Sequence, residues 1–305
     1  ADRFPFSYAE TTDHLTGKTD AICKRPETDP LVIHTQTATE YWQRHGSLVH
    51  TDTKGDDLPQ PEGVRVYLWS SSQHFADPNL KTPGRGVCRN LTNVVRTSML
   101  FRAMIAALDR WATDGTLPPP SRIPTRADGT LVTRDEWAAQ FPAIAGVAIP
   151  QSANSLPLYD FGPDAEAGIL AKEPPEIADP AGYAILVPAV DQDGNDVAGV
   201  RAPMVEAPLA TYTGWNLRGR SHGVGAMHEF TGSTVPFPET EEVRRATGDP
   251  RPSIKERYGG VEGYVHAITE AARKLVADGL MLVEDIERAA EAAADWDRAR
   301  HDLDI

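Results

Sequence analysis

The chain has 305 residues, of which 44 are acidic and 30 basic, so its formal net charge is −14 at pH 7. This acidic balance argues against a nucleic-acid-binding protein, whose surface needs a basic stripe. No run of about 18 apolar residues occurs, which excludes a membrane-spanning helix. The hydrophobic share of 40% is that of a globular protein, and the length fits one large α/β domain or two smaller domains.

The chain begins with Ala1, Asp2 and Arg3, without an initiating Met or a signal peptide. We therefore expect either a processed start or a piece of a longer protein, and the sequence predicts neither the compartment nor the oligomeric state. Two cysteines, Cys23 and Cys88, do not make a disulfide framework. One bridge and two reduced thiols both fit this pair.

Two short apolar runs, residues 31–35 and 64–69, predict neighbouring strands. Because both are apolar along most of their length, they suit a parallel sheet that is covered on both faces. Between them, residues 39–50 predict a short helix or turn, and residues 52–63 a loop.

The strongest helix pattern covers residues 93–112, and it ends at Asp114-Gly115 before three consecutive prolines. Its expected apolar face consists of Val94, Phe101, Met104, Ile105, Leu108 and Trp111. Residues 121–180 are rich in Pro and Gly and give no clear assignment.

The last part of the chain predicts a β-hairpin and two helices. Residues 185–190 and 197–201 flank a turn over 191–195, whose Asp, Gly and Asn residues tolerate positive φ. That turn resembles the start of a calcium loop but lacks its twelve-residue spacing and terminal Glu. An amphipathic pattern predicts a helix over residues 261–277. Residues 283–300, rich in Ala, Glu, Asp and Arg, predict a last helix that is polar on most faces and lies on the surface.

The residues that indicate chemistry are Glu40 and His74, which follow the two predicted strands. Because ligands bind beyond the carboxyl ends of parallel strands, these side chains are expected to meet at one edge of the sheet. A carboxylate there can hold the imidazole in one tautomer, and the imidazole can act as general base toward a hydroxyl nucleophile. The alternatives are that Glu40 caps a helix and that His74 is a structural loop histidine.

Several longer strings of the sequence resemble a family of bacterial, esterase-like proteins described as α/β hydrolase domain-containing. The resemblance covers about Phe4 to Asp285, and a weaker likeness exists to tannase and feruloyl esterases. The strings are Thr39-Glu40-Tyr41-Trp42, Gln73-His74, Leu108-Asp109-Arg110-Trp111, Tyr212-Thr213-Gly214-Trp215-Asn216-Leu217-Arg218, Gly248-Asp249-Pro250-Arg251-Pro252-Ser253 and Glu256-Arg257-Tyr258.

The resemblance implies that Glu40 is the acid and His74 the base of a Ser-His-acid triad. Because Glu replaces the commoner Asp, Asp52 is the alternative acid. In this fold the serine precedes the acid and the histidine, in a strand–turn–helix unit. No such unit precedes Glu40 here, so the nucleophile is expected upstream of this chain.

One serine fits the G-x-S-x-G pattern of a nucleophile, namely Ser221 in Gly219-Arg220-Ser221-His222-Gly223. We do not expect it to be the nucleophile, because neither a buried strand nor a helix flanks it and its place in the chain order is wrong.

Other candidates carry less information. His34, His45, His50 and Asp52 do not have the spacing of a metal site, and neither a metal nor a cofactor is expected. The serines at 70–72 are candidates for the polar lining of a pocket. Trp42, Trp69 and Trp215 suit either an acyl pocket or the core.

The sequence thus predicts the C-terminal part of an α/β-hydrolase fold, a partial parallel sheet with helices. Residues 1–120 are expected to carry the acid and the histidine, and residues 121–305 to form a Pro/Gly-rich extension packed on that core. The expected activity is hydrolysis of a small-molecule carboxylic ester by a serine hydrolase that needs its own N-terminal segment. The alternative is a non-catalytic binding or scaffold module with the same architecture.

Overall fold

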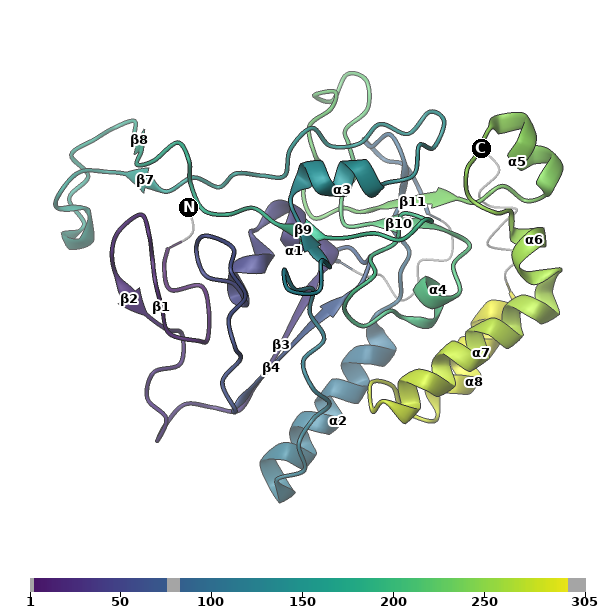
Figure 1. The fold of residues 1–305 in the computed structure, drawn as a ribbon, viewed down its shortest axis with the longest axis horizontal. Helices are drawn as coiled ribbons and strands as arrows, with labels where there is room; N and C mark the ends of the chain where they lie inside the picture. The colour runs from purple at the N-terminus through teal and green to yellow at the C-terminus, as the bar shows by residue number, and fades with distance from the viewer. Residues whose placement is uncertain (1–2, 76–82, 296–305) are drawn as a thin grey trace.

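The computed structural model of the chain describes residues 3–75 and 83–295. A parallel pair of strands, β3 (Val32–Thr37) and β4 (Val64–Trp69), lies near the middle of the molecule (Figure 1). The two strands pair in register over all six residues, which confirms the prediction of a parallel sheet. The other edge of β4 makes parallel bridges to Arg122 and Val200. The outer edge of β3 has no described strand beside it.

A short helix, α1 (Ala38–Gln43), begins directly where β3 ends, and the 3-10 helix η1 (Gly46–Val49) follows it. The start of α1 is a capping box, in which Thr37 and Glu40 bond each other's backbone and side chain. This box fixes the strand-to-helix corner. The prediction of a short helix or turn over residues 39–50 is confirmed.

A second, antiparallel sheet has the strand order β10 (Ala210–Thr213), β11 (Ser233–Pro236), β5 (Leu91–Thr92). Its strand β10 ends against the start of α1. At this point Gly214 approaches Ala38 so closely that an added Cβ would lie 2.4 Å from the Ala38 carbonyl carbon. A glycine is therefore required for the sheet to support α1 in its place.

The long helix α2 (Ser98–Asp114) confirms the helix prediction, and it ends at Gly115 with a φ of 77°. Its buried face differs from the predicted one, since Phe101 and Ile105 are 41% and 68% exposed. The helix also begins later than expected, and the Asn93 side chain instead donates to the Ser71 and Thr213 carbonyls and accepts from the Val95 N–H. The residues that α2 does bury are Leu100, Ala103, Met104, Ala107 and Trp111.

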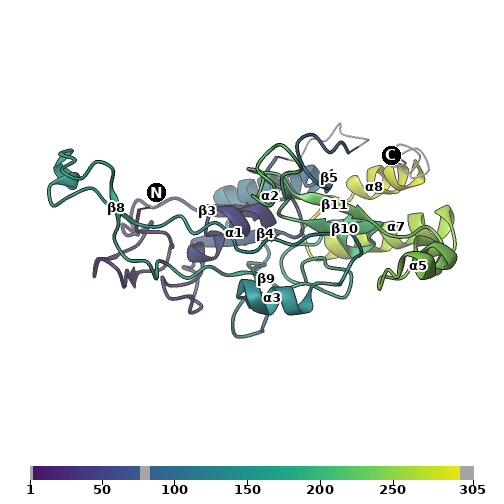
Figure 2. The same cartoon turned by 90° about the horizontal axis from the view of Figure 1, so that it is seen from above.

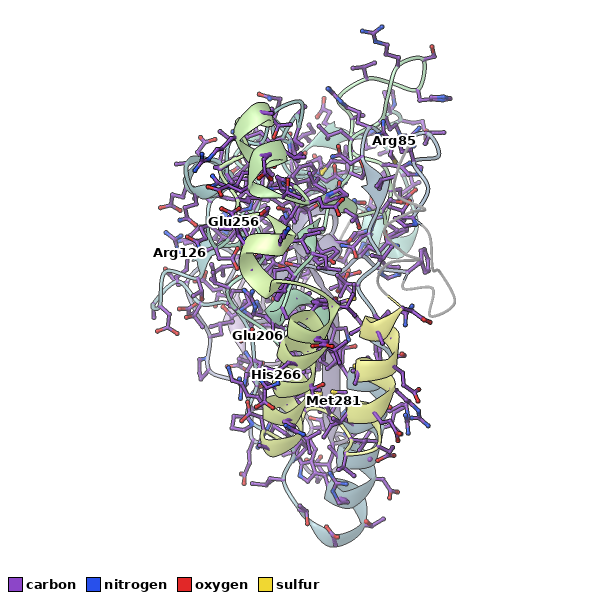
Figure 3. The ribbon with its side chains drawn as sticks, turned by 90° about the vertical axis from the view of Figure 1, so that its right-hand side faces the viewer. Arg85, Arg126, Glu206, Glu256, His266 and Met281 are labelled. Carbon is purple, nitrogen blue, oxygen red and sulfur yellow. The ribbon has the colours of Figure 1, made fainter. Side chains whose placement is uncertain are left out.

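The C-terminal helices α7 (Val261–Ala277) and α8 (Asp285–Ala294) pack side by side (Figure 3). Both helices were predicted, but α8 is not the surface helix with mostly polar faces that the sequence suggested, because its Ala289 and Ala293 are buried in the core cluster that also contains α7 residues. Residues 296–300, which the sequence also assigned to the last helix, lie outside the described residues. Met281, in the connection between the two helices, is buried in the hydrophobic cluster that the apolar side chains of α7 and α8 share.

The predicted hairpin forms only at its tip. Asp191 and Asn195 close the turn by a backbone hydrogen bond of 2.8 Å, and one bridge joins Val190 to Asp196. Beyond this tip the two arms separate, because each finds another strand. The first arm contains β9 (Val187–Pro188), which pairs with β6 (Leu131–Val132), and the second arm pairs with β4.

The remaining elements are short, as the content of Pro and Gly suggests. The strands β7 and β8 form a small antiparallel pair at the end of the molecule opposite α7 (Figures 1 and 2). The bounds are β1 Thr11–Thr12, β2 Thr19–Asp20, β6 Leu131–Val132, α3 Arg134–Gln140, β7 Tyr159–Asp160, η2 Ala165–Ala167, β8 Glu176–Ile177, α4 Pro203–Glu206, α5 Glu241–Thr247 and α6 Ile254–Tyr258.

An aromatic cluster joins the two parts that the sequence separates at about residue 120. Trp42 of α1 packs edge-on against Trp137 of α3, with ring centroids 4.7 Å apart, and Trp215 completes the group. Trp42 and Trp215 are thus core residues, and Trp69 is likewise buried. These ring contacts pack residues beyond 120 on α1, which follows the first strand of the pair. The division of the chain into two parts at residue 120 stays a prediction.

Candidate active site

The two strands of the parallel pair end side by side, and each is followed by one candidate residue. Thr37 and Trp69 are paired at the carboxyl ends of β3 and β4. Glu40 lies in the first turn of α1, and His74 lies in the loop after β4. Their side chains meet, and His74 Nδ1 hydrogen-bonds Glu40 Oε1. The structure therefore brings together the two residues that the sequence pointed to.

Glu40 both caps a helix and contacts the imidazole. Its Oε2 accepts a hydrogen bond of 2.6 Å from the Thr37 backbone N–H and another from the Thr37 hydroxyl. Its Oε1 remains for His74. The capping box thus holds the carboxylate in one rotamer, with one oxygen directed at the imidazole.

This contact determines what the imidazole can do. Because a carboxylate is an acceptor, Nδ1 carries the proton in the bond to Glu40, and the lone pair of a neutral ring is left on Nε2. His74 Nε2 makes no hydrogen bond within residues 3–75 and 83–295, and the side chain is 39% exposed. The pair therefore presents an oriented base to an incoming proton donor.

Two aromatic rings flank the imidazole. The ring of Phe230 lies over it with centroids 4.6 Å apart and a tilt of 31°, and Phe75 meets it edge-on at 4.5 Å. Phe75 is largely exposed. The surroundings of His74 are therefore apolar on the side away from Glu40.

The loop that carries Phe230 is tied to the same elements as the pair. Gln43 of α1 donates to the His228 carbonyl at 3.1 Å and accepts from the Phe230 N–H at 2.9 Å. Gln73, next to His74, accepts from the Gly232 N–H at 3.0 Å. Phe230 itself has a φ of 56°, a conformation that non-glycine residues rarely adopt. The molecule thus holds this ring against the imidazole with specific bonds.

Sequence reasoning missed Phe230, Gln43 and Gln73. Phe230 is far from His74 along the chain, and no spacing or motif connects them. The only sequence signal is that Gln43 and Gln73 lie close to Glu40 and His74.

The alternative acid and the alternative nucleophile lie elsewhere. Asp52 Oδ1 accepts from the backbone N–H groups of Lys54 and Asp56, at 2.8 and 2.9 Å, and so closes a turn. Ser221 lies in an exposed turn between the bridged residues Leu217 and Met227, with neither a strand nor a helix attached directly to it. A nucleophile elbow requires both.

We therefore expect Ser221→Ala to leave ester hydrolysis by the complete gene product within about twofold of wild type, because a residue outside the site contributes nothing to the transition state. Steady-state kinetics with an activated ester measures this. Loss of activity in a folded Ser221→Ala protein would identify Ser221 as the nucleophile and overturn the placement of the serine upstream.

The histidines considered as metal ligands have separate partners. His34 bonds the Tyr8 hydroxyl, His45 the Asn154 carbonyl and His50 the Tyr41 hydroxyl. Within residues 3–75 and 83–295, no three His, Cys, Asp or Glu residues are grouped to hold a metal ion. Cys23 and Cys88 are free thiols.

The serines at 70–72 are all buried and bond residues of the core, and their role as the lining of a pocket stays a prediction. Ser71, with a φ of 55°, donates its N–H to Asp196 Oδ2 at 2.5 Å, and its hydroxyl accepts from the Asp196 N–H at 2.7 Å. This reciprocal contact joins the turn after β4, which leads to His74, to the tip of the hairpin. Burial raises the pKa of the Asp196 carboxyl to about 7.

The raised pKa predicts a pH-dependent stability. The folded protein keeps a proton on Asp196 that the unfolded chain releases from about pH 4 upward, so this residue's contribution to stability falls as the pH rises toward 7. Asp196→Asn keeps an acceptor for the Ser71 N–H and removes the charge. We expect the variant to match wild type near pH 4 and to be more stable at pH 8, by roughly 2–4 kcal/mol.

Urea unfolding of both proteins at several pH values measures this difference. The comparison with wild type is needed because burial lowers the pKa of His50 to about 4, which makes stability rise with pH over much of the same range. A difference between variant and wild type that does not change with pH would contradict the prediction.

Comparison with known families agrees with the fold. The model of the alpha/beta hydrolase domain family matches residues 4–291, and the chain belongs to this family. Membership indicates a hydrolase-type function with a small-molecule substrate. Neither the curated proteins nor the solved structures contain a significant match to the chain, and the likeness to tannase and feruloyl esterases stays a prediction. In the described part of the chain, no helix is long and apolar enough to cross a membrane.

Proposed function

We propose that the chain supplies the acid and the base of a serine carboxylic ester hydrolase, with Glu40 as the acid and His74 as the base. The observation that carries the proposal is the Nδ1 bond from His74 to Glu40 at the carboxyl ends of two parallel strands, with Nε2 not bonded to any residue that the structure describes. In such a triad the carboxylate orients the imidazole and stabilises it when protonated.

The proposed reaction has two proton transfers through His74 Nε2. The imidazole first accepts the proton of a serine hydroxyl as the serine oxygen attacks the ester carbonyl, and it then gives this proton to the leaving alcohol. Water repeats the sequence on the acyl-enzyme and releases the carboxylic acid. The negative charge of Glu40 favours the protonated imidazole that occurs between these transfers.

We place the nucleophile in a segment upstream of this chain. In this fold the chain order is serine, acid, histidine, and Ser7 is the only serine before Glu40. Ser7 is buried and its hydroxyl bonds the Ala9 carbonyl, so it does not suit the role. The outer edge of β3, beside which residues 3–75 and 83–295 place no strand, supports the same proposal, because parallel strands occur in sheets with further strands and covered faces.

The apolar rings beside His74 favour an ester with an apolar acyl or alkoxy group. Phe75 and Phe230 offer such a group a surface next to the base. A charged group against these rings would lose hydration, and the cation beside Phe230, Arg44, is already paired with Glu229.

The test is to label the complete gene product with a serine-reactive fluorophosphonate and to assay it with p-nitrophenyl esters. We expect stoichiometric labelling of one serine upstream of Glu40 together with ester turnover. A folded protein that is neither labelled nor active would instead support a non-catalytic binding or scaffold module.

A further inference from the structure

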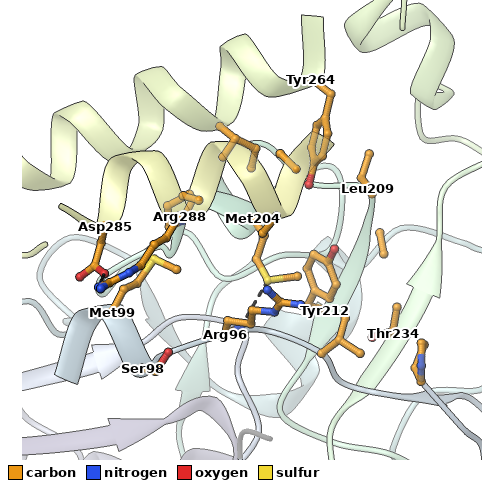
Figure 4. A pocket seen from close by; sticks show the side chains of 18 of the residues that line it. Arg96, Ser98, Met99, Met204, Leu209, Tyr212, Thr234, Tyr264, Asp285 and Arg288 are labelled. Atoms are coloured by element: carbon orange, nitrogen blue, oxygen red, sulfur yellow. Dashed lines mark hydrogen bonds and ion pairs between the residues drawn. The ribbon is translucent and has the colours of Figure 1, made fainter. Parts of the chain in front are cut away.

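A cavity of about 340 Å³ lies between the antiparallel sheet and the helices α2, α4, α7 and α8 (Figure 4). None of the residues of the Glu40–His74 site lines it. The volume falls within the range of small-molecule sites in proteins, which begins at about 300 Å³. The cavity is therefore large enough for an organic ligand.

The walls are mainly apolar. Two features leave the space open: the apolar side chains that α8 presents to it are the small ones of Ala289, Ala292 and Ala293, and two flexible methionines, Met99 and Met204, contribute to the remaining wall. Apolar surface that faces such a space remains exposed to water unless a ligand covers it. The larger apolar side chains in the wall are Met99, Met204, Leu209 and Ile268.

Three arginines line the cavity, and two of them are neutralised. Arg102 and Arg288 both form ion pairs with Asp285, and the distance from Arg288 to the Asp285 carboxylate is 2.7 Å. Arg96 forms no ion pair with any residue in the described ranges, and the one hydrogen bond it donates there is from its backbone to Met204. The cavity thus contains one guanidinium whose charge no described carboxylate balances, in a chain with a net charge of −14.

Arg96 lies on the cavity wall next to Tyr212 and Met204 (Figure 4). Arg96 and Tyr264 line the same cavity, and the positive charge of Arg96 opposes the rise in pKa that burial imposes on the Tyr264 hydroxyl. A partly buried guanidinium without an anion is costly, and a carboxylate fits its planar fork with two parallel hydrogen bonds.

We propose that this cavity is a binding site for an organic monocarboxylate, with the carboxylate on Arg96 and an aryl or alkyl body against the apolar walls. One unbalanced guanidinium matches one negative charge, and the apolar surface excludes a ligand that is charged along its whole length. The site is an addition to the proposed hydrolase function and does not depend on it.

The test uses 4-phenylbutyrate as the probe and the uncharged 4-phenylbutanol as its matched control, with isothermal titration calorimetry on the complete gene product. Wild type is expected to bind the acid at least about tenfold more tightly than the alcohol. Arg96→Met keeps the apolar stem and should weaken binding of the acid about tenfold or more, while binding of the alcohol stays the same. Arg110→Met, at an exposed position of α2, should change neither affinity.

Two further variants separate the possible outcomes. Ala292→Trp, at an exposed position of the cavity lining, should weaken both probes and serves also if Arg96→Met does not fold. His74→Ala should leave binding unchanged, so that failure of the hydrolase proposal and failure of this one can be told apart. The proposal is overturned if wild type binds neither probe at millimolar concentration, binds both equally, or keeps its affinity for the acid in Arg96→Met or Ala292→Trp.

Discussion

Replacing His74 with Ala in the complete gene product is expected to lower kcat for an activated ester by about 10³-fold or more, with KM changed little. The imidazole transfers the proton in both halves of the proposed reaction, and general acid–base catalysis by a single group contributes about 10²–10⁴-fold. Because His74 is partly exposed and its only hydrogen bond in the described residues is to Glu40, the substitution leaves the core intact. Stopped-time assays of p-nitrophenyl ester hydrolysis measure the effect.

The matched control is His266→Ala, an exposed histidine on α7 that lies outside the site and should leave kcat unchanged. Glu40→Gln adds a second readout. The amide oxygen still accepts from the Thr37 N–H and preserves the start of α1, but the negative charge next to the imidazole is lost. We expect a smaller decrease, of about 10²-fold. Full activity in a folded His74→Ala protein would show that the pair has no catalytic role.

The meeting of Glu40 and His74 was predictable because it depends on local rules. Each apolar run forms a strand, the two strands pair in parallel, and residues that follow paired strand ends are close in space. Even the helix cap could be expected, since Thr37 and Glu40 have the spacing of a capping box. The two interpretations of Glu40, as cap and as partner of a histidine, are both correct because its two oxygens have different partners.

What the sequence did not predict depends on contacts between distant segments. The loop around Phe230 reaches the site through backbone bonds to Gln43 and Gln73, and backbone groups leave no mark in a sequence. The hairpin arms separate because β9 finds β6 as a partner, a choice that local turn residues do not encode. On α2 the pattern favoured Ile105 over Ala103 and Ala107, although close packing selected the small residues.

Arg251→Leu is expected to lower the free energy of unfolding by about 3–5 kcal/mol, the usual cost of removing one partner from a buried ion pair. Arg251 is 1% exposed and pairs with Asp249 at 2.6 Å. It also donates to the Thr211 hydroxyl at 2.8 Å and to the Val235 carbonyl at 2.9 Å. One guanidinium thus joins β10 to β11.

The substitution removes the guanidinium from the Asp249 carboxylate, which keeps only the backbone N–H of residue 251, and from the Val235 and Pro236 carbonyls. Burial raises the pKa of the Asp249 carboxyl, but the hydrogen bonds and the charge of Arg251 lower it by more than burial raises it. The pKa of Asp249 is therefore below its ordinary value. Adding Asp249→Asn to Arg251→Leu removes the uncompensated charge, and the double variant should therefore recover part of the lost stability.

Arg245→Leu is the matched control, because this arginine has a side chain that is 72% exposed and pairs with Glu241 on the surface. Its loss should cost less than about 1 kcal/mol. Urea unfolding at pH 7 measures all three variants. If Arg251→Leu costs no more than Arg245→Leu, the guanidinium does not hold the antiparallel sheet together. The support that this sheet gives to α1 through Gly214, and so to Glu40, must then come from the surrounding apolar core.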